Sequence, residues 1–207
     1  TSLLLNEKIK NNFDSLELIG SGSFGEVYKV RQKATSNFYA IKITELRPAA
    51  IKELQLLTHV QSVFVVKLES FWSENCNIFI QMEYCHENLK NVLESRHAAF
   101  NRDRNTLIKL IEGVNYLHKM NLAVIHRDLK PDNILISYNT IDTKRFIKLA
   151  DFGLATYHAE SNMEHTEGVG APAYTPYEVY NGVYGSKRDI YSLGVIGQKL
   201  FEIEFNG

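Results

Sequence analysis

The sequence predicts an α+β protein with two lobes, a small β-rich lobe followed by a larger helical one. Up to about residue 86, short segments rich in β-branched and aromatic residues alternate with turn signals, a pattern typical of strands. Beyond that point, apolar residues recur at helical spacing. Strands first and helices second favour an α+β architecture, and we place the boundary between the lobes near residue 86.

Length and composition indicate the class of protein. The 207 residues allow one domain with a sizeable core, or two small lobes that share a cleft. A formal net charge of −1 gives no indication of nucleic-acid or membrane-surface binding. Cys76 and Cys85 are too few for a disulfide framework, which favours a reducing compartment. Because the apolar run at residues 3–5 is too short for a signal peptide or a membrane span, we expect a cytoplasmic protein.

In the small lobe, the pattern predicts several strands and one helix. The helix is expected at residues 48–59. Pro48 would lie in its first turn, where proline is tolerated. The strands are expected at residues 13–19, 26–30, 38–43, 66–71 and 78–84.

In the large lobe, apolar residues at helical spacing predict helices at residues 102–120 and 190–201. The second of these is apolar over a wide arc, which indicates that it is buried. Short strands are expected at residues 134–136 and 146–149. Residues 155–184 show little regular pattern, and a loop that long inside a compact domain is usually functional or disordered.

The first motif with chemical content is G-x-G-x-x-G, formed by Gly20, Gly22 and Gly25. Alone, it fits a dinucleotide-binding fold, a kinase phosphate loop or a simple hairpin turn. In a dinucleotide-binding fold the third glycine opens a helix, whereas residues 26–30 alternate like a strand. Strand, glycine loop, strand is the arrangement in which protein kinases fold backbone N–H groups over the phosphates of ATP.

A lysine and a glutamate both occupy positions that are otherwise apolar. Lys42 lies on an apolar predicted strand, where a buried and unpaired ammonium group would cost several kcal/mol. Glu53 shares a helix face with Leu56 and Leu57, an unusual place for a lone carboxylate. An ion pair between Lys42 and Glu53 resolves both difficulties and directs the ammonium group at nucleotide phosphates. For either residue alone, a snorkelling or solvated side chain would be the simpler interpretation.

The most specific motif is HRDLKPDN at residues 126–133, which places an acid, a base and an amide in one loop. Phosphoryl transfer needs a carboxylate to accept the proton of the substrate hydroxyl, and Asp128 fits that role. Lys130 would offset charge on the moving phosphoryl group, and Asn133 would supply an oxygen ligand for Mg²⁺. Asp151, which opens an Asp-Phe-Gly sequence, would supply a second oxygen ligand. These motifs at this spacing predict a kinase fold.

Together these motifs resemble those of the eukaryotic protein kinase family, and the resemblance extends from Leu16 to about Phe205. It implies that residues 1–207 form a kinase catalytic domain, with an N-lobe at about 13–85 and a C-lobe at about 86–207. The implied reaction uses ATP and Mg²⁺ to phosphorylate a hydroxyl group of a protein substrate.

The resemblance also implies where the adenine ring binds. Met82 would be the gatekeeper, and Glu83 and Cys85 would belong to the hinge that hydrogen-bonds adenine. The apolar walls around the base would be Val27, Ala40 and Leu135.

Within the family, several details resemble the kinases of the alpha subunit of translation initiation factor 2. Residues 78–85 are close to their hinge strand, and Trp72 resembles the tryptophan that precedes it. Only eleven positions separate Lys42 from Glu53, a short link that these kinases share. The likeness implies that this alpha subunit is the substrate and that the chain forms a homodimer. Cell-cycle kinases of the Wee type share the hinge and the tryptophan, but their catalytic loop differs.

Three further residues carry expectations about acceptor and regulation. Lys130 is typical of serine/threonine kinases. Arg127 resembles the arginine of kinases that are switched on by phosphorylation, since it can pair with a phosphate. Residues 165–170 match the activation segment of the translation-factor kinases, which would make Thr166 the autophosphorylation site.

The sequence departs from the family pattern at several places. Ala171 replaces a threonine whose hydroxyl normally bonds near the catalytic aspartate and lysine. The Ala-Pro-Glu sequence that closes the activation segment reads Pro-Tyr-Glu at residues 176–178. The link at residues 73–77 lacks the long insert that the translation-factor kinases often carry. Because the sequence stops at Gly207, before further helices of the larger lobe, we expect an incomplete C-lobe.

Two functional hypotheses follow from these observations. The first is an active serine/threonine kinase, because the lysine, glutamate, catalytic aspartate and metal-ligand residues are all present. The second is a pseudokinase or ATP-binding scaffold, which Ala171 and Tyr177 favour. A nucleotide-binding oxidoreductase is disfavoured by the strand after Gly25.

Overall fold

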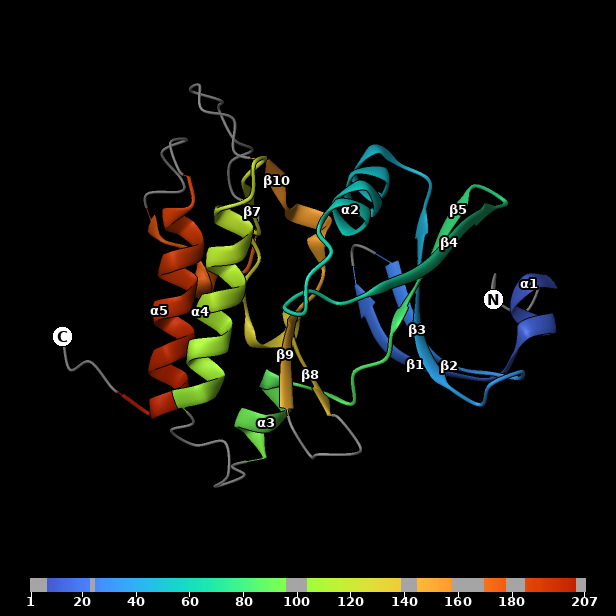
Figure 1. The fold of residues 1–207 in the computed structure, drawn as a ribbon, viewed down its shortest axis with the longest axis horizontal. Helices are drawn as coiled ribbons and strands as arrows, with labels where there is room; N and C mark the ends of the chain where they lie inside the picture. Colours follow the sequence, from blue (N-terminus) through green and yellow to red (C-terminus); the bar gives the residue numbers. More distant parts are fainter. Residues whose placement is uncertain are drawn as a thin grey trace. The chain divides into compact units, whose positions relative to one another are not determined.

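The computed structural model describes residues 7–22, 25–95, 104–138, 145–157, 170–177 and 185–203. The chain divides into two compact units, whose elements are labelled in Figure 1. The first unit combines Thr1–Gln61 with Val66–Cys85, and the second combines Ser62–Val65 with His86–Gly207. Within the ranges given above, no helix is long and apolar enough to cross a membrane.

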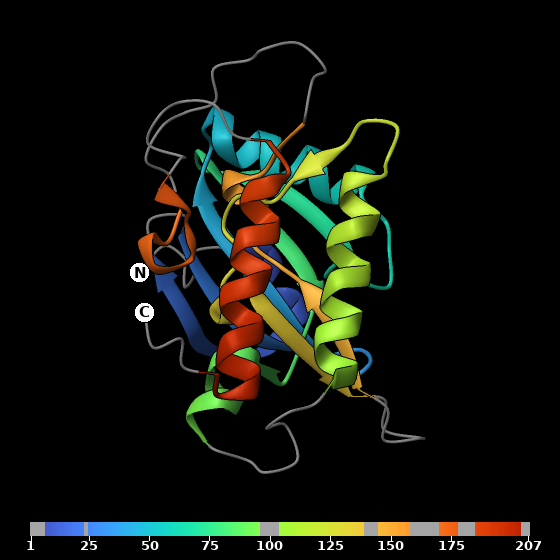
Figure 2. The same ribbon diagram turned by 90° about the vertical axis from the view of Figure 1, so that its left-hand side faces the viewer.

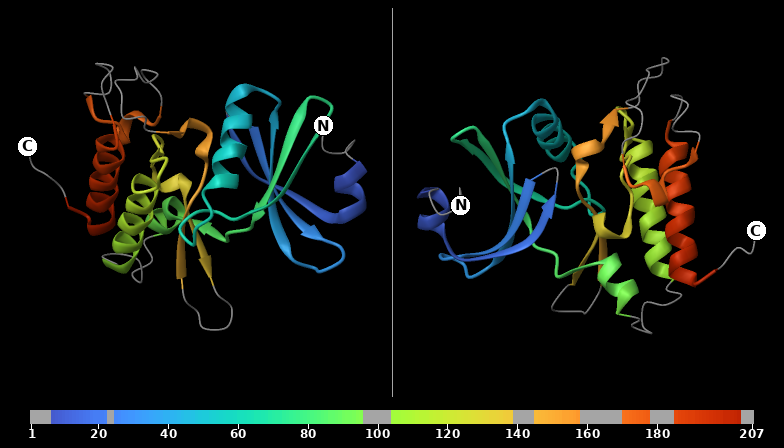
Figure 3. Two further views of the ribbon diagram at one scale, coloured as in Figure 1. Left: turned by 45° about the horizontal axis from the view of Figure 1, so that its top comes forward. Right: turned by 180° about the vertical axis from the view of Figure 1, so that it is seen from behind.

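The first unit is built on a five-stranded antiparallel sheet with the strand order β1-β2-β3-β5-β4. Its twist is visible in both views of Figure 3. The strands are β1 (Phe13–Gly22), β2 (Gly25–Gln32), β3 (Phe38–Glu45), β4 (Leu68–Glu74) and β5 (Asn77–Glu83). Two helices accompany the sheet, α1 (Glu7–Asn12) and α2 (Pro48–His59).

Strand register sorts the side chains of this sheet onto two faces. Val27 on β2 pairs with Lys42 on β3, and Lys42 pairs with Ile80 on β5. Directly opposite residues in a ladder point to the same side of a sheet, so these three side chains share one face. Ala40 and its partner Met82 lie two residues from Lys42 and Ile80 on their strands, so they belong to the same face.

The opposite face carries the apolar core of the first unit. Phe79 stacks on Trp72 with the ring centroids 5.1 Å apart, and Ile9 of α1 closes the cluster. The buried members of this core are Ile9, Phe13, Val30, Ile41, Ile43 and Phe79. The two faces therefore differ in chemistry, because one carries this apolar cluster while the other carries the Lys42 ammonium group.

The second unit contains two long helices that lie side by side, α4 (Arg104–His118) and α5 (Lys187–Phe201) (Figure 2). Both bury an apolar stripe at helical spacing, which explains why these residues form amphipathic helices. The stripe residues are Leu110, Val114 and Leu117 on α4 and Leu193, Ile196 and Leu200 on α5. The shorter α3 (Leu89–Glu94) is capped by the preceding Asn88, whose side chain accepts a hydrogen bond from the Asn91 N–H group.

Short strands and turns of the second unit hold its functional loops. One sheet has the order β6-β8-β9, and β7 pairs with β10 in a second sheet. The strands are β6 (Glu87–Asn88), β7 (Val124–Ile125), β8 (Ile134–Tyr138), β9 (Arg145–Leu149) and β10 (Thr156–Tyr157). Turns of 3-10 helix occur at Pro131–Asn133, Phe152–Leu154 and Pro172–Tyr174.

The observed elements confirm the predicted α+β class, and α2 spans the predicted residues. β4 covers Leu68–Glu74, so it begins two residues later and ends three residues later than predicted. Val65, just before the predicted strand, forms a bridge to Leu149 of β9. The sequence did not predict α1, α3 or the two-residue strands. Elements of two to six residues are too short to display a hydrophobic period.

Candidate active site

The glycine motif lies where β1 turns into β2. Gly20 and Gly22 end β1, Gly25 begins β2, and Gly22 pairs with Gly25. Gly25 has a φ angle of +113°, and a Cβ atom there would lie 2.1 Å from the backbone oxygen of Ile43. Only glycine fits this position, because both the backbone angle and the adjacent strand exclude a side chain. Ser23 and Phe24 lie outside the described residues.

The structure brings Lys42 of β3 and Glu53 of α2 into contact. The Lys42 Nζ atom lies 2.6 Å from one carboxylate oxygen of Glu53 and 2.9 Å from the other. Both side chains are almost fully buried, with 6% and 4% of their surface exposed. The bidentate contact offsets the cost of burying each charge and fixes the ammonium group on the face that carries Val27, Ala40 and Met82.

The predicted gatekeeper and hinge residues lie at the end of β5 and just after it. Met82 is buried, and the Glu83 N–H group donates to the backbone oxygen of Lys67 at 3.0 Å. The Glu83 carboxylate accepts a hydrogen bond from the Lys67 N–H group at 2.7 Å, which ties the end of β5 to the segment before β4. Cys85 is half-buried. Leu135, the remaining predicted wall residue, belongs to β8 of the second unit.

Asp128 is the centre of the hydrogen-bonded cluster in the second unit. Its side chain is buried, and its Oδ2 atom accepts from Lys130 Nζ at 2.8 Å and from Asn133 Nδ2 at 2.9 Å. Its Oδ1 atom accepts from the Ala171 N–H group at 3.1 Å. Asn133 Nδ2 also donates to the Asp128 backbone oxygen at 2.9 Å. Three donors therefore hold an ionised carboxylate in one orientation.

Asp189, the third residue of α5, holds the predicted catalytic loop, residues 126–133, in place. Its fully buried carboxylate accepts hydrogen bonds from the N–H groups of His126 and Arg127, both at 2.9 Å. Arg127 has a φ angle of 66°, a conformation that costs free energy in a non-glycine residue and persists where the surroundings fix it. His118 Nε2 lies 2.8 Å from the same carboxylate. Arg127 Nε donates to the Leu154 backbone oxygen at 2.6 Å.

Asp151 lies two residues after the end of β9 and also has a left-handed backbone, with a φ angle of 62°. The next residue, Phe152, is buried and packs on His126 with the ring centroids 4.9 Å apart. His126 Nε2 lies 3.1 Å from the Ala150 backbone oxygen, and His126 Nδ1 accepts from the Asp128 N–H group at 3.4 Å. These contacts tie the Asp151 turn to the loop of residues 126–133.

The oxygen atoms that the second unit offers as metal ligands suit a hard cation. Asn133 uses both Nδ2 hydrogens on Asp128, so its amide oxygen faces away from that carboxylate. Asp151 adds a carboxylate in the same unit. One amide oxygen and one carboxylate are the ligand types with which Mg²⁺ is held beside phosphate oxygens and water. Within the described ranges, no group of three or more His, Cys, Asp or Glu side chains is arranged to hold a metal ion by itself.

The sequence pattern of the protein kinase domain matches residues 13–205. This chain belongs to the protein kinase family. The kinase domain is 32% identical over 206 residues to calcium-dependent protein kinase 4 of Plasmodium falciparum, covering 95% of this chain and 38% of that protein. It is 34% identical over 226 residues to the interferon-induced, double-stranded RNA-activated protein kinase of Rattus norvegicus, covering 96% and 42%.

A third relative of the kinase domain is serine/threonine-protein kinase 4 homolog B of Dictyostelium discoideum. The two are 31% identical over 197 residues, which covers 92% of this chain and 17% of that protein. The chain thus spans about two fifths of the length of the first two relatives and less of the third.

Sequence reasoning missed two contributors to the site of this kinase domain. His118 was not singled out, because nothing in its spacing pointed to Asp189, which follows 71 residues later. The loss of a side-chain hydroxyl at Ala171 was predicted, but the hydrogen bond from its N–H group to Asp128 was not. Thr166 and Glu178 lie outside the described residues.

Proposed function

We propose that this kinase domain transfers the γ-phosphate of ATP, with Mg²⁺, to a serine or threonine hydroxyl of a protein substrate. The observation that carries the proposal is the Asp128 carboxylate, held by Lys130, Asn133 and the Ala171 N–H group. Family membership and the serine/threonine kinase among the relatives add support. We also propose that residues 13–85 act as its N-lobe and residues 86–207 as its C-lobe.

Each unit offers residues for the nucleotide and the metal. In the first unit, Lys42 is the candidate for holding phosphate groups, because the Glu53 carboxylate fixes the position of its ammonium group. In the second unit, Asn133 and Asp151 are the candidates for holding Mg²⁺. Bound MgATP would supply the phosphoryl group together with the cation that offsets its negative charge.

Asp128 is the proposed catalytic base. A carboxylate has about four lone-pair positions, two on each oxygen. Oδ2 already accepts two hydrogen bonds, while Oδ1 accepts one, from the Ala171 N–H group. Oδ1 therefore has room for the hydroxyl proton of the substrate. The Lys130 ammonium group, 2.8 Å from Oδ2, stabilises the carboxylate and the negative charge that develops during transfer.

We further propose that the substrate is the alpha subunit of translation initiation factor 2 and that the kinase acts in the cytoplasm, as a homodimer. The support comes from the hinge strand, Trp72 and the short link from Lys42 to Glu53. The identities to the double-stranded RNA-activated kinase and to the calcium-dependent kinase, 34% and 32%, are too close to decide the substrate.

Phosphate incorporation from labelled ATP with Mg²⁺ tests the proposal. The acceptors are the chain itself, the factor's alpha subunit, and matched serine, threonine and tyrosine peptides. Asp128→Asn removes the base, and we expect incorporation to fall about 100- to 10,000-fold. Asp14→Asn is the matched control, because Asp14 lies in an exposed ion pair with Arg31. Incorporation only into tyrosine peptides would contradict the serine/threonine assignment.

The second candidate function is an ATP-binding pseudokinase. It is favoured by Ala171, which lacks the hydroxyl of the family pattern, and by Tyr177, which replaces proline and is 80% exposed. Nucleotide binding without transfer to any acceptor, in the natural protein and in Asp128→Asn alike, would establish this function and contradict the first.

A further inference from the structure

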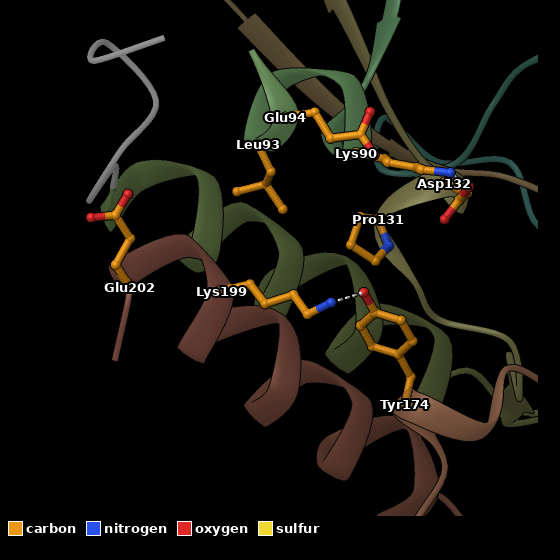
Figure 4. A pocket seen from close by; sticks show the side chains of 8 residues that line it. All are labelled: Lys90, Leu93, Glu94, Pro131, Asp132, Tyr174, Lys199 and Glu202. Carbon is orange, nitrogen blue, oxygen red and sulfur yellow. Dashed lines mark hydrogen bonds and ion pairs between the residues drawn. The ribbon is translucent and has the colours of Figure 1, made fainter. Parts of the chain in front are cut away.

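A pocket of about 440 Å³ lies beside the catalytic loop within the second unit (Figure 4). It is bounded by α3 and α5, and by Pro131 and Asp132, which directly follow Lys130 in the chain. Tyr174, a further wall residue, comes three positions after Ala171, whose N–H group bonds Asp128. Part of the pocket wall thus belongs to the two segments that hold the Asp128 carboxylate.

One cation and one carboxylate of this pocket neutralise each other. Lys90 Nζ lies 3.2 Å from the Asp132 carboxylate. The hydrogen bond and charge of Asp132, with a smaller contribution from Glu94, raise the pKa of Lys90. The charge of Lys90 is therefore directed mainly at Asp132 and, to a smaller extent, at Glu94.

Lys199 has a different environment. In Figure 4 its side chain extends across the pocket to Tyr174, while Glu202 points the other way. Lys199 Nζ lies 2.8 Å from the Tyr174 hydroxyl oxygen and 4.8 Å from the centre of its ring. Among the residues that the structure describes, Lys199 forms no ion pair with a carboxylate.

The Lys199–Tyr174 contact leaves donors available for a ligand. An ammonium group can only donate, so the Tyr174 oxygen accepts and its own hydrogen points elsewhere. In the described ranges that hydrogen has no acceptor. Lys199 has three N–H donors, of which Tyr174 takes one. A cation and a neutral O–H donor side by side match an oxyanion.

We propose that this pocket binds an acidic side chain of the protein substrate, close in sequence to the phosphorylated residue. Lys199 and Tyr174 donate to its anionic oxygens, and Leu93 and Pro131 contact its methylene groups. The inference rests on the proposed kinase function and adds a substrate preference to it.

A basic substrate side chain fits the pocket less well. Its cation would approach the Lys199 ammonium group, which no carboxylate neutralises in the described part of the chain. Of the three carboxylates that line the pocket, Asp132 is engaged by Lys90, Glu94 also acts on Lys90, and Glu202 points away from Tyr174 (Figure 4). An acidic side chain, in contrast, gains a charge-assisted hydrogen bond, the stronger kind in proteins.

Peptides with one serine test the proposal on the intact protein. Single flanking positions carry glutamate, glutamine, lysine or phosphoserine, and both peptide binding by fluorescence anisotropy and kcat/KM are measured. At one flanking position or more, we expect glutamate to be preferred over glutamine about tenfold, the effect of one charge-assisted hydrogen bond. Phosphoserine in place of glutamate reveals whether the oxyanion is a carboxylate or a phosphate.

Variants of Lys199 identify the group that reads the acid. Lys199→Met should reduce the glutamate-to-glutamine ratio to about one, and Lys199→Glu should favour lysine instead. Lys187→Glu is the matched control, because Lys187 is an exposed lysine twelve positions earlier on α5, about 18 Å away along the helix axis. This control should keep the preference of the natural protein.

Two results would overturn the pocket proposal: equal binding of all peptides, or a preference for glutamate that survives in Lys199→Met. The binding measurement needs no phosphate transfer. A preference in binding without any transfer would therefore support the pocket and contradict the kinase function, whereas transfer without a preference would do the reverse.

Discussion

At the scale of single residues, a backbone group takes part in holding the Asp128 carboxylate, the proposed catalytic base. The Ala171 N–H group donates to Asp128 Oδ1 at 3.1 Å, and the Ala171 carbonyl accepts from the Thr175 hydroxyl at 2.9 Å. Neither bond involves the alanine side chain. Although the threonine hydroxyl of the family pattern is missing, the backbone of this segment still supports the orientation of Asp128.

Removing that N–H group should reduce catalysis. Ala171 has a φ angle of −77°, close to that of proline, so Ala171→Pro removes the donor while keeping the backbone angle. A hydrogen bond to a charged group is worth about 1.5–3 kcal/mol, so we expect kcat to fall about tenfold or more. Ala171→Ser retains the N–H group and serves as the control in the same phosphate-transfer assay. Equal kcat values in the two variants would contradict this role.

At the scale of elements, the turn between β1 and β2 depends on one glycine. In Gly25→Ala the new Cβ atom would overlap the Ile43 carbonyl oxygen, and a φ angle of +113° is strained for alanine. We expect a loss of at least about 1–3 kcal/mol in the free energy of unfolding, measured by chemical denaturation. At Gly22 an added Cβ atom meets nothing within 4 Å, so Gly22→Ala should cost less. A larger loss at Gly22 than at Gly25 would show that this packing is not decisive.

A hydrogen bond between Tyr138 of β8 and Glu87 of β6 should make the stability of the protein fall at high pH. The Tyr138 hydroxyl donates to Glu87 at 2.6 Å, and burial, followed by this hydrogen bond, raises the pKa of Tyr138 to about 12. The phenol ionises near 10.0 in the unfolded chain, so its contribution is complete below pH 10 and is lost between pH 10 and about 12.

We therefore expect the natural protein to be more stable than Tyr138→Phe at pH 8, with the difference shrinking towards pH 12. Urea denaturation at a series of pH values measures it, since each comparison is made at one pH. A difference that stays constant or grows with pH would contradict the stabilising contact between Tyr138 and Glu87.

At the scale of the whole molecule, the two units have separate apolar cores. The first core surrounds Ile41 of β3, and the second includes Leu117 of α4, both fully buried. Ile41→Ala and Leu117→Ala should each cost about 2–5 kcal/mol through lost burial and the cavity left behind. Hydrogen exchange should show the loss of amide protection concentrated in the unit that carries the substitution. Uniform loss across both units in either variant would indicate a single cooperative core.

Much of the fold and part of the site could be predicted because they depend on local pattern. Apolar spacing predicts α2 and the stripes of α4 and α5, and alternation predicts the strands of the first sheet. The pairing of Lys42 with Glu53 could also be predicted, because a charge buried on an apolar face is costly unless an opposite charge pairs with it. The motif around Asp128 predicted the protein kinase family directly.

By itself, the sequence determined the class of fold, the family and the identity of the chemical groups, because periodicity and motif spacing are properties of neighbouring residues. Only the tertiary structure decided how Asp189 and His118 fix the catalytic loop, how the Ala171 N–H group reaches Asp128, and how Lys199 meets Tyr174. These contacts join residues 25 to 71 positions apart. The packing of α4 and α5 and the path of the loops determine which residues meet, and no local sequence pattern predicts either of them.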